Sequence, residues 1–236
     1  MSELRISSVP NVPEIHEGDD VVAALLRALD ESGMELRDRD LVTITSKVVS
    51  KSEGRVVPCD GSDEQKVALI EGEARRILRR RGTLRITETK HGFVCANAGI
   101  DLSNTSDGTA VLLPVDPDRT ARRYRAELRQ RRGVDVAVII TDTFGRVWRQ
   151  GVTDVGLGSA GLRPVLDLRG TTDATGRVLE ATEVAIVDEI AGAVNLVLGK
   201  AAGTPFAVVR GLDASFFGEG SVQEHVVRRP TDDLFR

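Results

Sequence analysis

The sequence predicts a mixed α/β (α+β) fold with mixed sheets and packed helices. Helix-like and strand-like segments alternate in the first 82 residues, which favours parallel or mixed pairing. Three strand-like segments between 84 and 113 then follow one another without a helix, so the sheet cannot be simply doubly wound. The near-continuous apolar run at 134–140 is typical of a strand buried on both faces. No repeat or low-complexity linker divides the chain, so any second domain must be interleaved with the first.

Hydrophobic periodicity and turn residues locate the elements in order. Strands are predicted where β-branched or alternating apolar residues recur, at 4–9, 41–45, 84–88, 93–97, 109–113, 134–140, 165–168 and 205–209. Helices are predicted where apolar residues recur at helical spacing after a capping residue, at 20–33, 62–82, 116–133 and 182–198.

Two of these helices carry particular signals. Ser62 and Gln65 make a capping box, and the apolar stripe that follows predicts one long helix ending at Gly82. The last helix is expected to be capped by Thr182 and is apolar almost all round, so we expect it to be buried. Asp188 and Glu189 inside it would have to pair with arginine, cap backbone groups or approach a metal site.

Composition excludes several classes of function. Aromatic residues make up only 3% of the 236 residues and the net charge is -4, so neither base stacking nor attraction to polyanions favours nucleic-acid binding. Cys59 and Cys95 form no disulfide framework and no zinc motif. The sequence has no apolar run of roughly 18 to 20 residues and no signal sequence. We therefore expect a cytoplasmic protein without membrane association.

Two acidic segments next to glycines are suited to a metal ion. Asp101 and Asn104 follow the strand at 93–97, and Asp142 and Thr143 are expected to end the strand at 134–140. Carboxylate, amide and hydroxyl oxygens are ligands for Mg or Mn, and strand ends are where open sheets bind ligands. Either segment alone could also be a capped turn, and sequence spacing does not show whether the two meet.

Two other segments could bind phosphate. Ser46, Lys47 and Lys51 supply hydroxyl and ammonium donors at a strand end, and the glycine-rich stretch 218–221 could turn backbone N–H groups toward an anion. A solvated surface strand and an irregular tail are the alternatives. No Walker motif occurs, which excludes a P-loop site.

The string from Gly156 to Gly161 matches G-x-G-x-x-G, the dinucleotide-binding pattern. That pattern requires a helix to begin inside it, whereas Pro164 and the strand-like 165–168 follow here. We favour a close-packed glycine turn over a dinucleotide site.

Five strings, in order and spread over most of the chain, resemble the coenzyme F-420:L-glutamate ligases: VTITSKVVSKSEGR, HGFVCANAGIDLSN, ITDTFGRVWRQGVTDVGLGSAG, VDEIAGA and VVRGL. The resemblance implies GTP-dependent addition of L-glutamate to the lactyl carboxylate of coenzyme F-420-0, with release of GDP and phosphate. It also implies a homodimer, a fold of two interleaved subdomains over 1–236, and two divalent ions, Mg or Mn. A monovalent cation is a further option.

The resemblance also implies roles for individual residues. Asp101 and Asp142 would be catalytic, and the metal ligands would be Asp101, Asp142, Thr143 and Glu219. The nucleotide would contact residues of four segments: Val12, Pro13, Glu14, Ile15, Ser46, Lys47, Lys51, Asn104, Gly218, Glu219, Gly220 and Ser221.

The expected chemistry agrees with these residue types. A carboxylate is a poor electrophile, so an amide would form through an acyl phosphate, without a protein nucleophile. Three alternatives stay open: another metal-dependent acid–amino-acid ligase or phosphotransferase, a dinucleotide-binding oxidoreductase built on 156–161, and a non-catalytic nucleotide-binding module. The segment 226–236 resembles a linker, since some relatives are fused to a flavin-dependent reductase domain.

Overall fold

The computed structural model describes residues 3–101, 108–199 and 203–235. Within these ranges the central sheet has five strands. Their order across the sheet is β1 (Arg5–Val9), β12 (Phe206–Arg210), β2 (Leu41–Thr45), β8 (Ala137–Arg146) and β9 (Arg149–Ala160). Only the central β2–β8 pair among these is parallel, which confirms the predicted mixed sheet.

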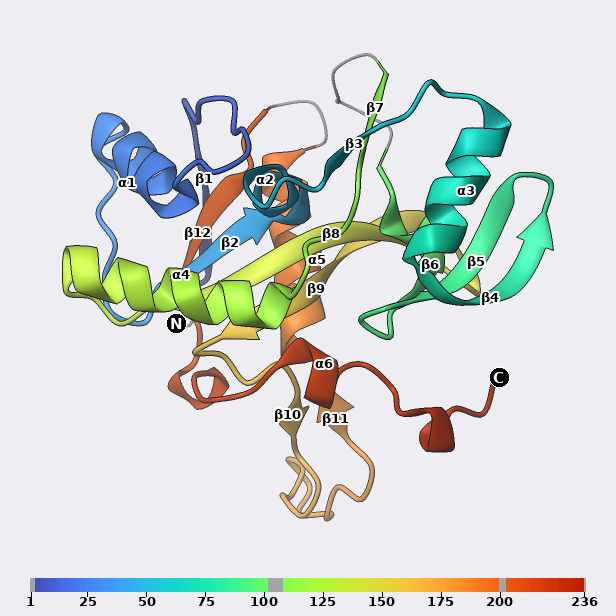
Figure 1. The fold of residues 1–236 in the computed structure, drawn as a ribbon. Coiled ribbons are helices and arrows are strands. Elements are labelled where there is room, and N and C mark those ends of the chain that lie inside the picture. The colour runs from blue at the N-terminus through green and yellow to red at the C-terminus, as the bar shows by residue number, and fades with distance from the viewer. Residues whose placement is uncertain (1–2, 102–107, 200–202, 236) are drawn as a thin grey trace.

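Helices cover both faces of this sheet (Figure 1). In Figure 1, α1 (Val21–Glu31), α2 (Ser46–Ser52) and α4 (Pro117–Arg132) lie in front of it, and α5 (Ile186–Leu198) lies behind. Asp19 or Asp20 was expected to cap α1, and the structure shows Asp20 as the cap, because its side chain accepts a hydrogen bond from the Ala23 N–H at 2.8 Å. The core lies between these layers, since the apolar side chains of β2, β12 and the first part of β8, at 137–140, are buried on both faces of the sheet.

Smaller elements lie beside the central sheet (Figure 1). One group contains β4 (Ala74–Arg81), β5 (Leu84–Thr89) and β6 (Val94–Ala96), which pair in antiparallel fashion, together with α3 (Asp63–Glu73). The pairs β3 (Val56–Pro58) with β7 (Thr109–Val111) and β10 (Leu166–Asp167) with β11 (Glu183–Val184) are also antiparallel. The short α6 (Val222–His225) follows β12. The two interleaved subdomains and the linker at 226–236 stay predictions.

The predicted helix at 62–82 is wrong in its second half. Its start is confirmed, because Ser62 Oγ accepts from the Gln65 N–H at 3.2 Å. The helix ends at Glu73, however, and the arginine-rich residues that follow form β4, which turns at Gly82 and pairs with β5. Pairing with a neighbouring strand satisfies the backbone of both segments, and this tertiary gain overrides a local helical pattern.

The predicted strand at 134–140 is also misplaced. β8 begins at Ala137 and continues to Arg146, then reverses through Val147 and Trp148 into β9. Asp142 and Thr143 therefore lie inside a long β-hairpin and do not end a strand. The added length comes from pairing with β9, and a local hydrophobic pattern does not reveal such pairing.

Residues 156–160 of the glycine string form the end of β9 and not a turn, and Gly161 follows the strand with a φ of 74°. The close packing predicted for it is confirmed, because a Cβ atom on Gly158 would lie 2.3 Å from the Pro117 carbonyl carbon. No helix begins inside the string. The dinucleotide-binding alternative is therefore wrong, since its pyrophosphate would have no helix N-terminus to bind.

The last helix differs from its prediction at both ends. α5 begins at Ile186 after Ala185, with no side-chain cap, so Thr182 does not cap it. Its C-terminal turn is only partly buried, because Leu196 is 87% exposed whereas Leu198 is buried. Asp188 does cap a backbone group, as one alternative required: its Oδ1 accepts from the Gly156 N–H at 2.9 Å. Burial raises the pKa of Asp188, and this hydrogen bond partly offsets the shift.

Among the described residues, no helix is both long enough and apolar enough to cross a lipid bilayer.

Candidate functional site

The parallel pairing of β2 and β8 brings two predicted segments together. Thr45 pairs with Thr141, so Ser46, which follows β2, lies beside Asp142, which follows Thr141. Ser46 is buried, and its hydroxyl donates a hydrogen bond to the Asp142 carboxylate. The predicted strand end at Ser46 thus exists, but residues 46–52 continue as α2 and not as a surface strand.

Asp101 joins this cluster from the segment that bridges to β7. Its backbone exchanges two hydrogen bonds with Val111, at 2.9 and 2.8 Å, which fixes its position. Its carboxylate lies 2.7 Å from the Lys47 ammonium group and close enough to Asp142 to raise the pKa of that residue. The two acidic segments therefore meet, which the sequence spacing left open.

An unusual backbone turn precedes Asp101. Asn97, Ala98 and Gly99 have φ angles of 52°, 54° and 69°, so three successive residues are left-handed. The left-handed conformation costs roughly 1–2 kcal/mol at each non-glycine residue. The turn is held because Asn97 Oδ1 accepts from the Arg85 N–H and the Ala98 N–H donates to Thr87 Oγ1, at 3.0 and 2.9 Å. Strain is thus concentrated next to the candidate site.

Thr143 lies beside Asp142 on β8 and is oriented by an acid that the sequence prediction missed. Its hydroxyl donates to Asp154 Oδ1 at 2.5 Å, and its N–H donates to Asp142 Oδ1 at 2.8 Å. Asp154 is buried and is the cross-strand partner of Thr143 on β9. Only the register of the hairpin reveals this pair, so no local signal could have identified Asp154.

The electrostatics of the cluster centre on Asp142. Burial raises the pKa of Asp142 to about 7, and the negative charges of Asp101 and Asp154 act in the same direction. Hydrogen bonds from the Thr143 N–H and the Ser46 hydroxyl oppose this shift but do not cancel it. Like charges that converge in this way favour a cation at the same place.

The loop at 12–15 lies against α2. Glu14 forms an ion pair with Lys51, and this hydrogen bond lowers the pKa of Glu14. Ile15 is buried and Val12 packs against the core, so the loop has apolar anchors. Pro13 and Glu14 are exposed between them. The two lysines of α2 therefore both contact carboxylates, Lys47 with Asp101 and Lys51 with Glu14.

The segment from Gly218 to Ser221 is not brought to this cluster within one chain. Glu219 is 83% exposed at its side chain and accepts from Arg125, which also pairs with Asp135 just before β8. Asp135 lies seven residues before Asp142, or roughly 20 Å along an extended chain.

Packing and internal hydrogen bonds account for the glycines of this segment. A Cβ on Gly218 would meet the Arg163 side chain at 2.7 Å, and one on Gly220 would meet Pro164 at 2.5 Å. The Ser221 hydroxyl accepts from the Glu224 N–H and begins α6. Asn104, the remaining predicted nucleotide contact, lies outside the described residues.

The donor atoms present fit a hard divalent cation. Asp101 and Asp142 supply carboxylate oxygens, and Thr143 and Ser46 supply hydroxyl oxygens, which Mg and Mn accept. The described residues contain no set of three or more His, Cys, Asp or Glu side chains in metal-holding geometry. Phosphate oxygens and water would therefore have to complete the coordination, as is usual for Mg at phosphate sites.

Carboxylates, hydroxyls and lysines that converge beside parallel strands are typical of enzymes that act on phosphate-bearing substrates with a divalent cation.

The family model described as F420-0:Gamma-glutamyl ligase matches residues 10–211. The chain is 38% identical to the coenzyme F420:L-glutamate ligase of Methanothermobacter thermautotrophicus over 249 aligned positions, which cover 99% of both chains. It is 40% identical to the ligase of the same name from Methanopyrus kandleri, over 99% of this chain and 98% of that one. The protein therefore belongs to the F420-0:gamma-glutamyl ligase family.

Proposed function

We propose that the protein is a GTP-dependent ligase that joins L-glutamate to the lactyl carboxylate of coenzyme F420-0 through an amide bond, releasing GDP and phosphate. The convergence of Asp101, Asp142 and Thr143 with Lys47, one helical turn before Lys51 on α2, supports this reaction in a chain that belongs to a glutamyl ligase family. Carboxylates for a metal ion and ammonium groups for phosphate are the two requirements of phosphoryl transfer.

The reaction proceeds in two steps that balance without a protein nucleophile. A carboxylate oxygen of the coenzyme attacks the γ-phosphorus of GTP, forming an acyl phosphate and releasing GDP. The glutamate amine then attacks the carbonyl carbon, loses a proton, and phosphate leaves. Asp101, Asp142 and Thr143 would hold divalent ions, Mg or Mn, which neutralise phosphate charge when bound. Lys47 and Lys51 would exchange their present carboxylate partners for phosphate oxygens.

A product mass spectrum tests this proposal. Protein incubated with coenzyme F420-0, L-glutamate, GTP and Mn should yield the coenzyme enlarged by glutamyl residues, together with GDP. Calorimetry with GTP and with ATP adds a second test, since GTP binding should require Mn and should disappear with a chelator. A glutamylated product formed with ATP alone would contradict the GTP requirement, and a product only from a different acid would favour the alternative ligase.

Lys51→Ala is expected to weaken GTP binding about 10-fold, because one charge-assisted contact to phosphate is lost. The fold should be little affected, since Glu14 is 67% exposed and ion pairs with a solvated partner contribute little to stability. Calorimetric titration with GTP and Mn measures the change. Lys66→Ala, which removes the same charge from α3, is the control. Equal GTP affinity in wild type and Lys51→Ala would remove Lys51 from the site.

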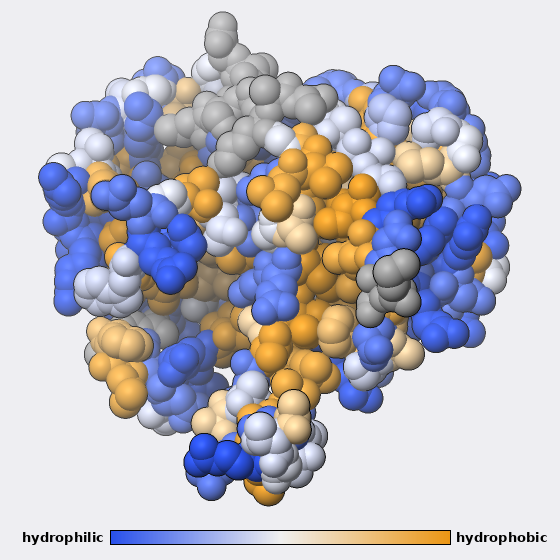
Figure 2. Space-filling model, turned by 180° about the vertical axis from the view of Figure 1, so that it is seen from behind, coloured by the Kyte–Doolittle hydropathy of each residue, from blue (hydrophilic) through white to orange (hydrophobic). Residues whose placement is uncertain are grey.

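We also propose that the protein is a homodimer, with the exposed apolar side of α5 in the interface. Figure 2, which views the molecule from the α5 side, shows apolar side chains gathered over the middle of this face. Light scattering should give about twice the chain mass of 25.5 kDa. Leu196→Glu should shift the protein toward monomer, whereas Leu234→Glu should not, although both leucines are 87% exposed. A wild-type monomer at micromolar concentration would contradict the dimer.

A further inference from the structure

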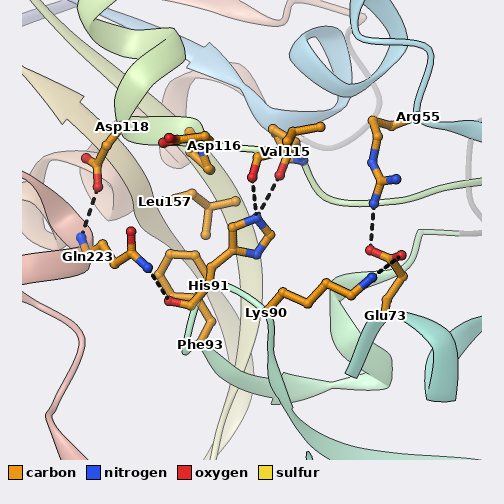
Figure 3. Close-up of a pocket in the computed structure, with 12 residues that line it drawn as sticks. Arg55, Glu73, Lys90, His91, Phe93, Val115, Asp116, Asp118, Leu157 and Gln223 are labelled. Atoms are coloured by element: carbon orange, nitrogen blue, oxygen red, sulfur yellow. Dashed lines mark hydrogen bonds and ion pairs between the residues drawn. The ribbon is translucent and has the colours of Figure 1, made fainter. Parts of the chain in front are cut away.

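A cavity of about 300 Å³ lies beside the candidate site and shares no residue with it. Figure 3 shows its two ends. Arg55, Lys90 and Glu73 lie at one end, and Asp116 and Asp118 lie at the other. The apolar side chains between them are those of Phe93, Pro114, Val115, Pro117 and Leu157. The cavity is therefore polar at both ends and apolar in the middle.

The basic end carries an excess of positive charge. Arg55 Nη2 lies 2.6 Å from Glu73 Oε2, and Lys90 Nζ lies 3.1 Å from Glu73 Oε1. Two cations thus share one carboxylate, as the dashed lines in Figure 3 show. Arg55 is also fixed by a hydrogen bond from its Nε to the Leu113 carbonyl at 3.1 Å. This end is suited to the carboxylate of a ligand.

The acidic end is held rigidly by the backbone. Asp118 is buried and accepts from the N–H groups of Ser159, Val222 and Gln223, at 2.9, 2.9 and 3.0 Å. Asp116 caps α4 through Oδ1, which accepts from the Arg119 N–H at 2.9 Å. Two fixed carboxylates at one end favour a positively charged group there.

His91 lies between the two ends, and one of its nitrogens lacks a partner. Its Nε2 contacts the carbonyl oxygens of Pro114 and Val115 at 2.8 and 3.1 Å. Carbonyl oxygens only accept, so Nε2 carries the proton. The Nδ1 atom is buried, and no group among the described residues hydrogen-bonds to it. A buried polar atom of this kind is destabilising unless a ligand or a water satisfies it.

Two contacts link the cavity to the candidate site. The Phe93 ring packs edge-on against Phe144, two residues after Asp142, with ring centres 6.0 Å apart. The Leu112 N–H donates to the Arg55 carbonyl at 3.0 Å, next to the Val111 bridge to Asp101. The cavity is therefore placed for a second substrate of a reaction at the candidate site.

We infer that this cavity binds L-glutamate, an inference that rests on the proposed ligase function. Arg55 and Lys90 would bind the side-chain or the main-chain carboxylate of the ligand. Asp116 and Asp118 would bind its ammonium group, and the apolar wall would contact its methylene groups. A nucleoside triphosphate is disfavoured, because Glu73, Asp116 and Asp118 outnumber the two permanent cations in the lining. A small zwitterion with an additional carboxylate matches both ends.

Two substitutions test the two ends separately. Lys90→Met should raise the KM for L-glutamate about 10-fold, while kcat and the KM for GTP change less than about 2-fold. Asp116→Asn preserves the helix cap but removes a charge that faces the ammonium group, so it should also raise the KM for L-glutamate. Both variants should keep the wild-type thermal midpoint, since neither residue is buried.

Glutarate, which lacks the amino group, separates this binding mode from a general loss of activity. Inhibition by glutarate should weaken in Lys90→Met but stay at the wild-type level in Asp116→Asn. Lys66→Met serves as the matched control and should change none of these values. An unchanged KM for L-glutamate in Lys90→Met and Asp116→Asn would overturn the cavity assignment. Wild-type protein that forms no glutamylated product would instead overturn the ligase proposal itself.

Discussion

Asp142→Asn is expected to lower turnover by at least about 100-fold, which corresponds to roughly 2.7 kcal/mol of lost transition-state stabilisation. The substitution keeps the shape of the side chain but removes the charge that would offset a divalent cation. Asp142 lies in the middle of a long paired strand, with Ser46 and Thr143 bonded to its carboxylate. A ligand held on so rigid an element cannot be replaced by a neighbouring group. Steady-state rates of glutamyl transfer measure the loss.

The same substitution should raise stability in metal-free protein at alkaline pH. The pKa of Asp142 is raised to about 7 from the ordinary 3.8, so the folded state holds a proton that the unfolded state has lost between these values. Stability therefore falls as pH rises from about 4 to about 7 in wild type, and this loss is complete above pH 7. Asparagine has no such loss, so Asp142→Asn should be more stable at pH 8, by up to about 4 kcal/mol.

Denaturation with urea at pH 4 and pH 8, with a chelator present, measures this difference. At pH 4 the two proteins should be nearly equal in stability, and added Mn should stabilise only wild type. Near-normal turnover combined with a large loss of metal-free stability would show that Asp142 is a structural cap and that the metal site lies elsewhere.

Arg210→Met is expected to destabilise the fold by about 3 to 5 kcal/mol, because it leaves a buried carboxylate without its cation. Asp40, just before β2, is 1% exposed. Arg210 at the end of β12 donates to both of its oxygens, from Nε at 2.7 Å and from Nη2 at 2.6 Å. The pair thus joins neighbouring strands of the central sheet at one end. Urea denaturation at pH 7 measures the loss.

Two further variants give this prediction its controls. Arg169→Met breaks a comparable arginine–aspartate contact with Asp167, but both partners are exposed, so its denaturation midpoint should not move. The double variant Asp40→Asn with Arg210→Met should recover part of the lost stability, because no unpaired charge is then buried. Equal midpoints for wild type and Arg210→Met would show that solvent already reaches Asp40.

Helices and strands whose ends are set by neighbouring residues could be predicted from the sequence, whereas those defined by pairing with a distant segment could not. α1 and α4 are capped by their own residues Asp20 and Asp116, so their starts were predicted correctly. β4 was predicted as helix and β8 was predicted too short because each is defined by the strand that pairs with it, β5 and β9. The exposed end of α5 has the apolar composition of a buried helix, so composition alone predicted burial that the structure does not show there.

The candidate site shows the same division. Asp101 and Asp142 could be identified because their residue types and flanking glycines are local signals. Their convergence depends on the parallel β2–β8 pair and on the left-handed turn at 97–99, which only the folded chain reveals. Asp154 was missed because its role comes from hairpin register. The cavity that contains His91 was missed because its lining comes from segments far apart in the sequence.

The turn between β8 and β9 carries an intrinsic fluorescent probe. Trp148 is the single tryptophan of the chain, and it is 83% exposed at the tip of the hairpin that carries Asp142 and Thr143. Intrinsic fluorescence excited at the tryptophan band therefore reports on this tip alone. The emission should be that of a water-exposed indole and should be quenched readily by iodide. A blue shift with reduced quenching, on raising the concentration or adding substrates, would show that another surface has covered the hairpin tip.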